Sequence, residues 1–115
     1  MKAVKVDEVR PWTPPLHFDV DVSEFVGAAQ GAARFTWALA RMKPGGGAES
    51  HTHPDSEHAF FVIQGEMVVS NGRQEYRLRP GTAIFIPPGE PHSTRNAAPG
   101  ETVYLTVTSP PLPRR

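Results

Sequence analysis

The sequence predicts an all-β protein, an antiparallel double-sheet jelly roll or barrel that forms one domain over residues 1–115. Three observations predict this class. Short runs of apolar residues alternate with polar ones at the period of two that half-buried strands show. The 13 prolines and 10 glycines lie between these runs, where they end strands and form turns. The one helix-tolerant stretch, residues 23–33, is interrupted by Gly27 and Gly31, so we expect a turn or a short helical loop there.

The N-terminal half predicts an arm followed by two strands. Residues 3–9 alternate weakly and precede three prolines, so residues 1–15 are expected to form an edge strand or an arm. Residues 16–22 alternate cleanly, which predicts a half-buried strand with His17 on its solvent-facing side. Residues 34–43 predict a second strand, either face of which could line the interior. The Pro-Gly-Gly-Gly run after it is expected to end that strand.

The C-terminal half predicts short strands joined by tight turns. Asn71 and Gly72 give the strongest hairpin signal, because a type I′ turn needs positive φ at both central residues. The expected strands cover residues 60–63, 66–70, 74–78, 83–86 and 102–108, and a further strand begins at His92. These runs bring the total to about nine or ten short strands, as a jelly roll or barrel requires. Residues 110–115 are expected to form an untethered tail.

The composition argues against several classes of partner. Twelve Lys and Arg residues balance twelve Asp and Glu residues, so no net field would attract nucleic acid or an anionic membrane. The absence of cysteine excludes disulfides, thiolate metal ligands and a thiol nucleophile. The N-terminus lacks the apolar core of a secretory signal, and no apolar run approaches the ~20 residues of a membrane span. We therefore expect a cytoplasmic protein whose partner is a small molecule.

Three histidines lie close together in the stretch from Gly45 to Gly65. His51, His53 and His58 fall within eight residues of sequence. Side chains two residues apart on a strand share one face at a separation of about 6 to 7 Å. That separation suits two imidazoles on one metal ion. A fourth histidine, His92, lies in a second stretch rich in glycine and proline further along the chain.

These two stretches resemble the paired motifs of the cupin family. The first family motif, G-x5-H-x-H-x(3 or 4)-E-x6-G, is matched at Gly45, His51, His53 and Gly65. The second motif, G-x5-P-x-G-x2-H-x3-N, is matched without a gap at Gly81, Pro87, Gly89, His92 and Asn96. The resemblance implies a small single-domain cupin, a double-stranded β-helix that holds a metal ion.

One position departs from the family pattern. Counted back from Gly65, the position of the family's glutamate falls on His58, and Glu57 lies one residue early. Strand alternation places His58 and Phe60 on one face, so His58 points where the family's ligand points. Glu57 would then face away, or accept a hydrogen bond from an imidazole N–H. The alternative is that Glu57 replaces His58 as a ligand. The preferred site consists of four histidines, His51, His53, His58 and His92.

Ligand type leaves the identity of the metal open. Imidazole suits Fe, Ni, Cu and Zn, and the family resemblance adds Mn, so we expect one divalent transition metal. Neutral imidazoles leave the charge of the ion uncompensated, which favours Lewis-acid chemistry on an oxygen-bearing ligand. Trp37, Phe60 and Phe85 are the aromatic candidates for an apolar substrate pocket above the metal.

The family resemblance implies a metal-dependent enzyme that acts on an oxygen-chelating organic molecule. An oxygenase of the dioxygenase type is the leading hypothesis. A redox-neutral isomerase, cyclase or lyase is the first alternative, and a non-catalytic ligand-binding module or a metal-stabilised domain are others, because one fold hosts all of these functions. The resemblance also suggests a homodimer, in which residues 3–9 would form a strand that crosses to the partner.

Overall fold

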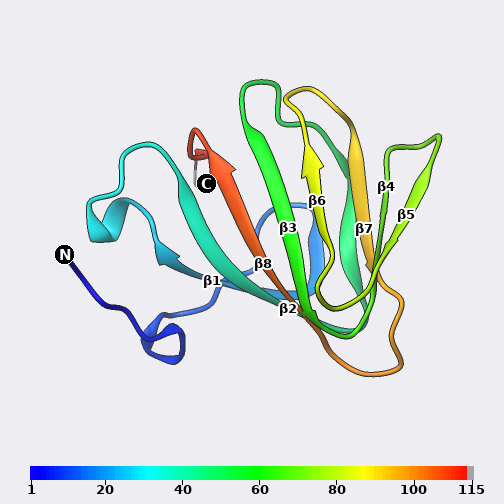
Figure 1. Ribbon diagram of the computed structural model, residues 1–115, viewed down its shortest axis with the longest axis horizontal. Helices are drawn as coiled ribbons and strands as arrows, with labels where there is room; N and C mark the ends of the chain where they lie inside the picture. Colours follow the sequence, from blue (N-terminus) through cyan, green and yellow to red (C-terminus); the bar gives the residue numbers. More distant parts are fainter. Residues whose placement is uncertain (114–115) are drawn as a thin grey trace.

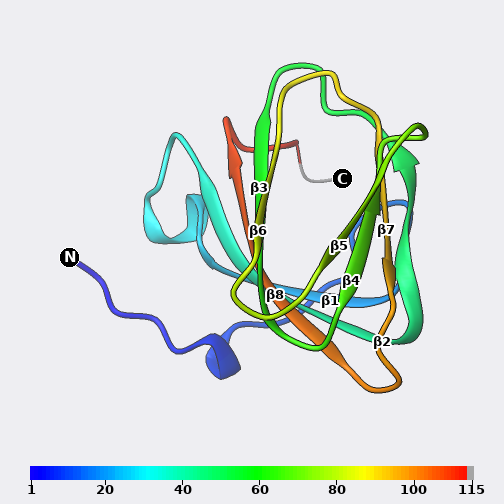
Figure 2. The same cartoon turned by 45° about the vertical axis from the view of Figure 1, so that its right-hand side comes forward.

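The computed structural model describes residues 1–113 as an antiparallel β-barrel that is nearly closed (Figures 1 and 2). Its strands are β1 His17–Val26, β2 Thr36–His51, β3 Glu57–Gln64, β4 Met67–Ser70, β5 Glu75–Leu78, β6 Ala83–Ile86, β7 His92–Asn96 and β8 Thr102–Ser109. The strand order is β5-β4-β7-β2-β8-β3-β6, and β1 pairs with β2. The predicted all-β barrel class is therefore confirmed. Two 3-10 turns, η1 Val6–Glu8 and η2 Ala28–Gln30, complete the regular structure of these residues.

The barrel has eight strands rather than nine or ten, and the expected strand that it lacks is the one at residues 3–9. The long strand β2 also differs from its expected range. We expected it to end at Pro44, but it continues through the glycines to His51. Its first half pairs with β8, and its second half pairs with β7. Gly47 permits this second pairing, because a Cβ there would lie 2.2 Å from the carbonyl oxygen of Thr94. The glycines therefore carry the strand across a close backbone contact.

Two other local expectations can be compared with the structure. Of the two alternatives for residues 1–15, an edge strand or an arm, the structure has the arm: residues 3–9 contain only the 3-10 turn Val6–Glu8, and Trp12 forms a backbone bridge to Val22. The β4–β5 hairpin exists, but Ser70 pairs with Glu75 around a four-residue loop rather than a type I′ turn. The Asn71 side chain causes this, because its Oδ1 accepts hydrogen bonds from the backbone N–H groups of residues 73 and 74. The helical loop expected within residues 23–33 is present as η2.

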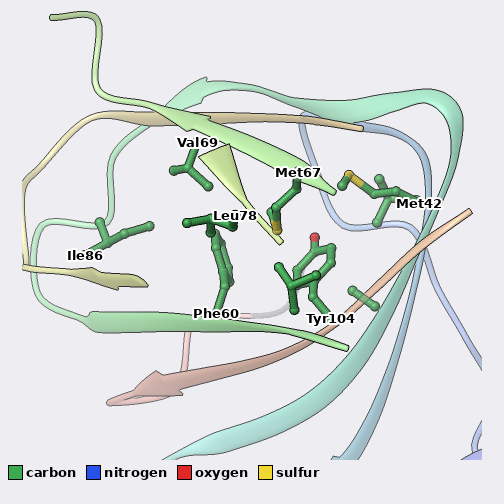
Figure 3. Packing of buried hydrophobic residues seen from close by; sticks show 10 residues of the cluster. Met42, Phe60, Met67, Val69, Leu78, Ile86 and Tyr104 are labelled. Atoms are coloured by element: carbon green, nitrogen blue, oxygen red, sulfur yellow. The ribbon is translucent and has the colours of Figure 1, made fainter. Parts of the chain in front are cut away.

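The core lies inside the barrel, where alternate residues of each strand converge. Met42, Val62 and Met67 are fully buried, and the ring of Phe60 packs edge-on against Tyr104 (Figure 3). On β2, Ala38, Ala40 and Met42 face inward, while Trp37 is 42% exposed on the outer face. The small alanines at two of these inward positions leave space inside the barrel beside the core. No helix in residues 1–113 is long and apolar enough to cross a bilayer. Of the expected tail 110–115, residues 114–115 lie outside the described part of the chain.

Candidate metal centre

The strand register brings the two histidine stretches together. His51 is the last residue of β2 and pairs directly with His92, the first residue of β7. His53 follows in the loop after β2, and its carbonyl accepts a hydrogen bond from the backbone N–H of Gly89, 2.9 Å away. This bond holds the loop of the first motif against the loop that leads into β7. Residues far apart in sequence therefore meet at one end of paired strands.

Three of the imidazoles form a tight group. The centroids of the His51 and His92 rings lie 4.3 Å apart, and the His53 ring lies 4.8 Å from His51 and 5.3 Å from His92. One nitrogen from each of the three lies within 4.8 Å of the others. The ring of His58, on β3, lies next to this group at 5.5 Å from His53 and 5.7 Å from His92. The structure thus groups three of the four expected ligands and places the fourth at their edge.

Backbone carbonyls fix which nitrogen is free in three of the rings, those of His51, His58 and His92. The Nδ1 atoms of His51 and His92 lie 2.6 Å and 3.1 Å from the carbonyl oxygens of Glu49 and Glu90. The Nδ1 of His58 lies 3.1 Å from the carbonyl oxygen of Val107. A carbonyl oxygen only accepts hydrogen bonds, so these partners assign the proton to Nδ1. Each Nε2 then keeps its lone pair, which is the arrangement that metal-binding histidines show.

The buried Nε2 of His92 tests whether these residues fit a metal ion. The side chain is 2% exposed, and this nitrogen has no hydrogen-bond partner among residues 1–113. A buried acceptor left without a partner costs free energy, about 1–3 kcal/mol. A cation placed among His51, His53 and His92 would satisfy it, and the donors are the neutral imidazoles that transition metals accept. The residues present therefore fit a divalent transition metal.

Burial favours the neutral form of three of these histidines. The pKa of His53 is lowered to about 4, mainly by burial and in smaller part by repulsion from the neighbouring histidines. Burial likewise lowers the pKa of His58 to about 3, with repulsion from His92 and His53 as smaller causes. The pKa of His92 is also lowered, mainly by burial. At neutral pH His53, His58 and His92 therefore need lose no proton before they bind a cation.

Glu57 points away from this group. It is exposed at the start of β3, while His58 next to it is partly buried, as strand alternation requires. Glu57 forms no hydrogen bond with an imidazole in the described part of the chain. Thr108, across the β3–β8 pair, takes the supporting position instead, with its hydroxyl 2.7 Å from the Nδ1 of His58.

A cavity of about 700 Å³ lies beside the histidines. His51, His53 and His58 line it, together with Phe60, Tyr104 and residues of the two chain ends. Of the three aromatic candidates, Phe60 is on this wall, with its ring 4.7 Å from that of His58. Trp37 packs against Phe25 on the outer face. Phe85 is 58% exposed and lines a separate cavity of about 230 Å³, which His92 also lines.

The sequence pattern did not predict the position of His17. We expected it to face solvent, but it is partly buried and lines the large cavity. The pairing of β1 with β2 shifts register between Phe18 and Val20, where Asp19 has a φ of +53°. This irregularity exchanges the two faces of the strand, so Phe18 is exposed and Val20 is buried. The alternating sequence pattern does not predict such a bulge.

The fold and the site define a class of protein, a small antiparallel β-barrel with a cluster of imidazoles beside a cavity. The family description "Cupin domain" matches residues 38–108, which is more than half of the sequence. This chain therefore belongs to the cupin family.

The relatives include proteins connected with polyketides. The chain is 31% identical over 84 residues to "Polyketide synthase CurC" of Streptomyces cyaneus, a match that covers 73% of this chain and 54% of that protein. It is 30% identical over 73 residues to "Tetracenomycin polyketide synthase protein TcmJ" of Streptomyces glaucescens, covering 64% and 49%. This chain thus spans about half the length of these curated relatives.

Several solved structures match nearly the whole chain. The polyketide cyclase RemF from Streptomyces resistomycificus has a TM-score of 0.84 and 27% sequence identity, and the match covers 99% of this chain and 84% of that one. The similarity therefore extends beyond the motifs to the arm and the strand order.

Proposed function

We propose that this protein is a metal-dependent enzyme that acts on an oxygen-rich small molecule, with redox-neutral ring closure as the favoured reaction class. The observation that carries the proposal is the group formed by His51, His53 and His92, whose nitrogens lie within 4.8 Å of one another. It lies at the edge of a cavity of about 700 Å³, a volume in the range of small-molecule sites. The similarity to a structure described as a polyketide cyclase supports ring closure over the oxygenase that the sequence alone favours.

Each residue of the proposed site has a separate role. His51, His53 and His92 would hold the ion, and His58 at their edge is the proposed fourth ligand. A divalent ion held there supplies Lewis-acid polarisation of a carbonyl or enol oxygen. Phe60 and Tyr104 line the cavity and make part of its wall apolar, which suits the carbon skeleton of an organic substrate. Ring closure of this kind joins a carbon between two carbonyls to a third carbonyl carbon, and it releases water without an oxidant.

The experiment separates three functions. Metal content is measured on the purified protein, and the loaded protein is then incubated with 1,3-diketones, catechols and 2-oxo acids while dissolved oxygen and products are followed. Product formation without oxygen uptake is the expected result. Oxygen consumption would support the oxygenase instead. Tight binding with neither outcome would support a non-catalytic binding module.

A further inference from the structure

The fifth histidine of the chain lies in the same cavity as the metal centre. His17 begins β1, and its ring centroid lies 5.8 Å from that of His51. It lines the large cavity together with His51 and His53. Its nitrogens do not belong to the group formed by His51, His53 and His92. His17 is thus beside the metal centre without being part of it.

The ring of His17 is held as the neighbouring ligands are held. Its Nδ1 lies 2.9 Å from the carbonyl oxygen of Pro15, two residues earlier in the chain. His51 and His92 make the same contact with the carbonyls two residues before them. Because the carbonyl accepts, Nδ1 donates and Nε2 keeps its lone pair. Among residues 1–113 this Nε2 has no hydrogen-bond donor, so a residue of the cavity wall carries an unpaired acceptor.

A second polar atom of the cavity wall also lacks a partner. The Oγ1 of Thr106 is buried and has no hydrogen-bond partner among residues 1–113. Thr106 pairs with Ala38 on one side and with Phe60 on the other, so it lies between a small residue and an aromatic ring. Buried polar groups are usually satisfied, and those that are not need a reason. A ligand with hydroxyl groups would provide hydrogen-bond partners for both the Oγ1 of Thr106 and the Nε2 of His17.

We propose that His17 is a specificity-determining residue, whose Nε2 accepts a hydrogen bond from a hydroxyl of the substrate. The substrate class is a planar enol or phenol that offers a chelating pair of oxygens to the metal centre and carries a separate O–H group. This inference rests on the proposed function, because the chelating oxygens orient the molecule. In this role His17 recognises the hydroxyl group of the substrate and is not a ligand of the metal ion.

The test compares three proteins, the wild type and two variants of His17, with two ligands. Kojic acid and allomaltol are hydroxypyranone chelators that differ in one hydroxyl group. His17→Asn can still donate to the Pro15 carbonyl but has no atom at the Nε2 position, whereas His17→Gln restores an acceptor. The affinities of both probes for the zinc-loaded proteins are measured by calorimetry. We expect the wild type to bind kojic acid about fivefold more tightly than allomaltol, the size of one net hydrogen bond.

The substitutions give distinct outcomes. His17→Asn should remove the preference while leaving zinc stoichiometry and allomaltol affinity unchanged, and His17→Gln should restore part of it. Equal affinity of the two probes for the wild type, or a preference that survives in His17→Asn, would overturn the role of His17. Loss of zinc from His17→Asn would also overturn it, because His17 would then be a ligand. Failure of the wild type to bind zinc or either probe would instead refute the proposed function.

Discussion

Acidification should destabilise the metal-free protein, and His58 should cause a measurable part of the loss. The pKa of His58 is about 3 in the folded protein, against 6.5 for an ordinary histidine, because burial penalises the charged ring. The folded value is the lower one, so the unfolded chain binds the proton more readily. The stability that neutral His58 contributes is therefore complete above pH 6.5 and is lost as the pH falls toward 3.

The size of the effect follows from these two values. Between pH 7 and pH 5 the unfolded chain gains about 0.7 of a proton at this position while the folded protein gains almost none. The free energy of unfolding should fall by about 2 kcal/mol from His58 over this interval. His53, with a pKa of about 4, changes stability in the same direction. The total dependence should therefore exceed that of His58 alone.

The assay compares the wild type with His58→Asn after removal of metal. Asparagine keeps a side-chain N–H that can donate to the Val107 carbonyl, but it does not titrate. Unfolding by guanidinium chloride at pH 7, 6 and 5 gives the free energy of each protein. The wild type should lose about 2 kcal/mol more than the variant between pH 7 and pH 5. Parallel pH dependences would refute the reasoning, because His58 would then titrate alike in both states.

Three further predictions concern the site, the fold and the assembly. His92→Ala should lose bound metal while Glu57→Ala keeps most of it, measured by elemental analysis after dialysis; the reverse result would move the ligand to the carboxylate. Gly65→Ala should lower the free energy of unfolding by about 2 kcal/mol or more, because Gly65 has a φ of +84° and its Cβ would lie 2.3 Å from the Oγ1 of Thr102. Gly100→Ala is the matched control, since its Cβ meets open space. The homodimer stays a prediction, which light scattering at micromolar concentration tests and a monomer would contradict.

Local pattern and turn chemistry predicted most of the barrel because they act over a few residues. The strand Ala83–Ile86 was expected at those residues, and the last strand differs from its expected range by a single residue at its end. Alternation works where one face of a strand is buried. The boundary at Pro44 could not be predicted, since the continuation of β2 depends on β7, which is formed by residues about fifty positions later. Sequence neighbours carry no information about such a partner.

The candidate site likewise has a part that local sequence predicts and a part that depends on tertiary pairing. Spacing within the motifs selected His51, His53 and His92, which the structure brings together. The place of His17 depended on a register shift and a positive φ at Asp19, and these arise from tertiary pairing rather than from the pattern of the strand. A bulge of one residue is enough to turn a side chain from solvent into a cavity. His17, which the alternating pattern placed on the solvent-facing side, thus lies beside the group formed by His51, His53 and His92.

The arrangement of ligands links the metal centre to the stability of the barrel. His51 and His92 belong to the paired strands β2 and β7, whereas His58 belongs to β3, which joins that side of the barrel only through β8. The strand order ends at β5 and β6, so no backbone pairing closes the ring between them. An ion bound by ligands from both sides would bridge parts of the sheet that backbone hydrogen bonds join by a longer route. Because an ion that binds only the folded chain stabilises it by mass action, occupancy of the site and resistance to unfolding should rise together.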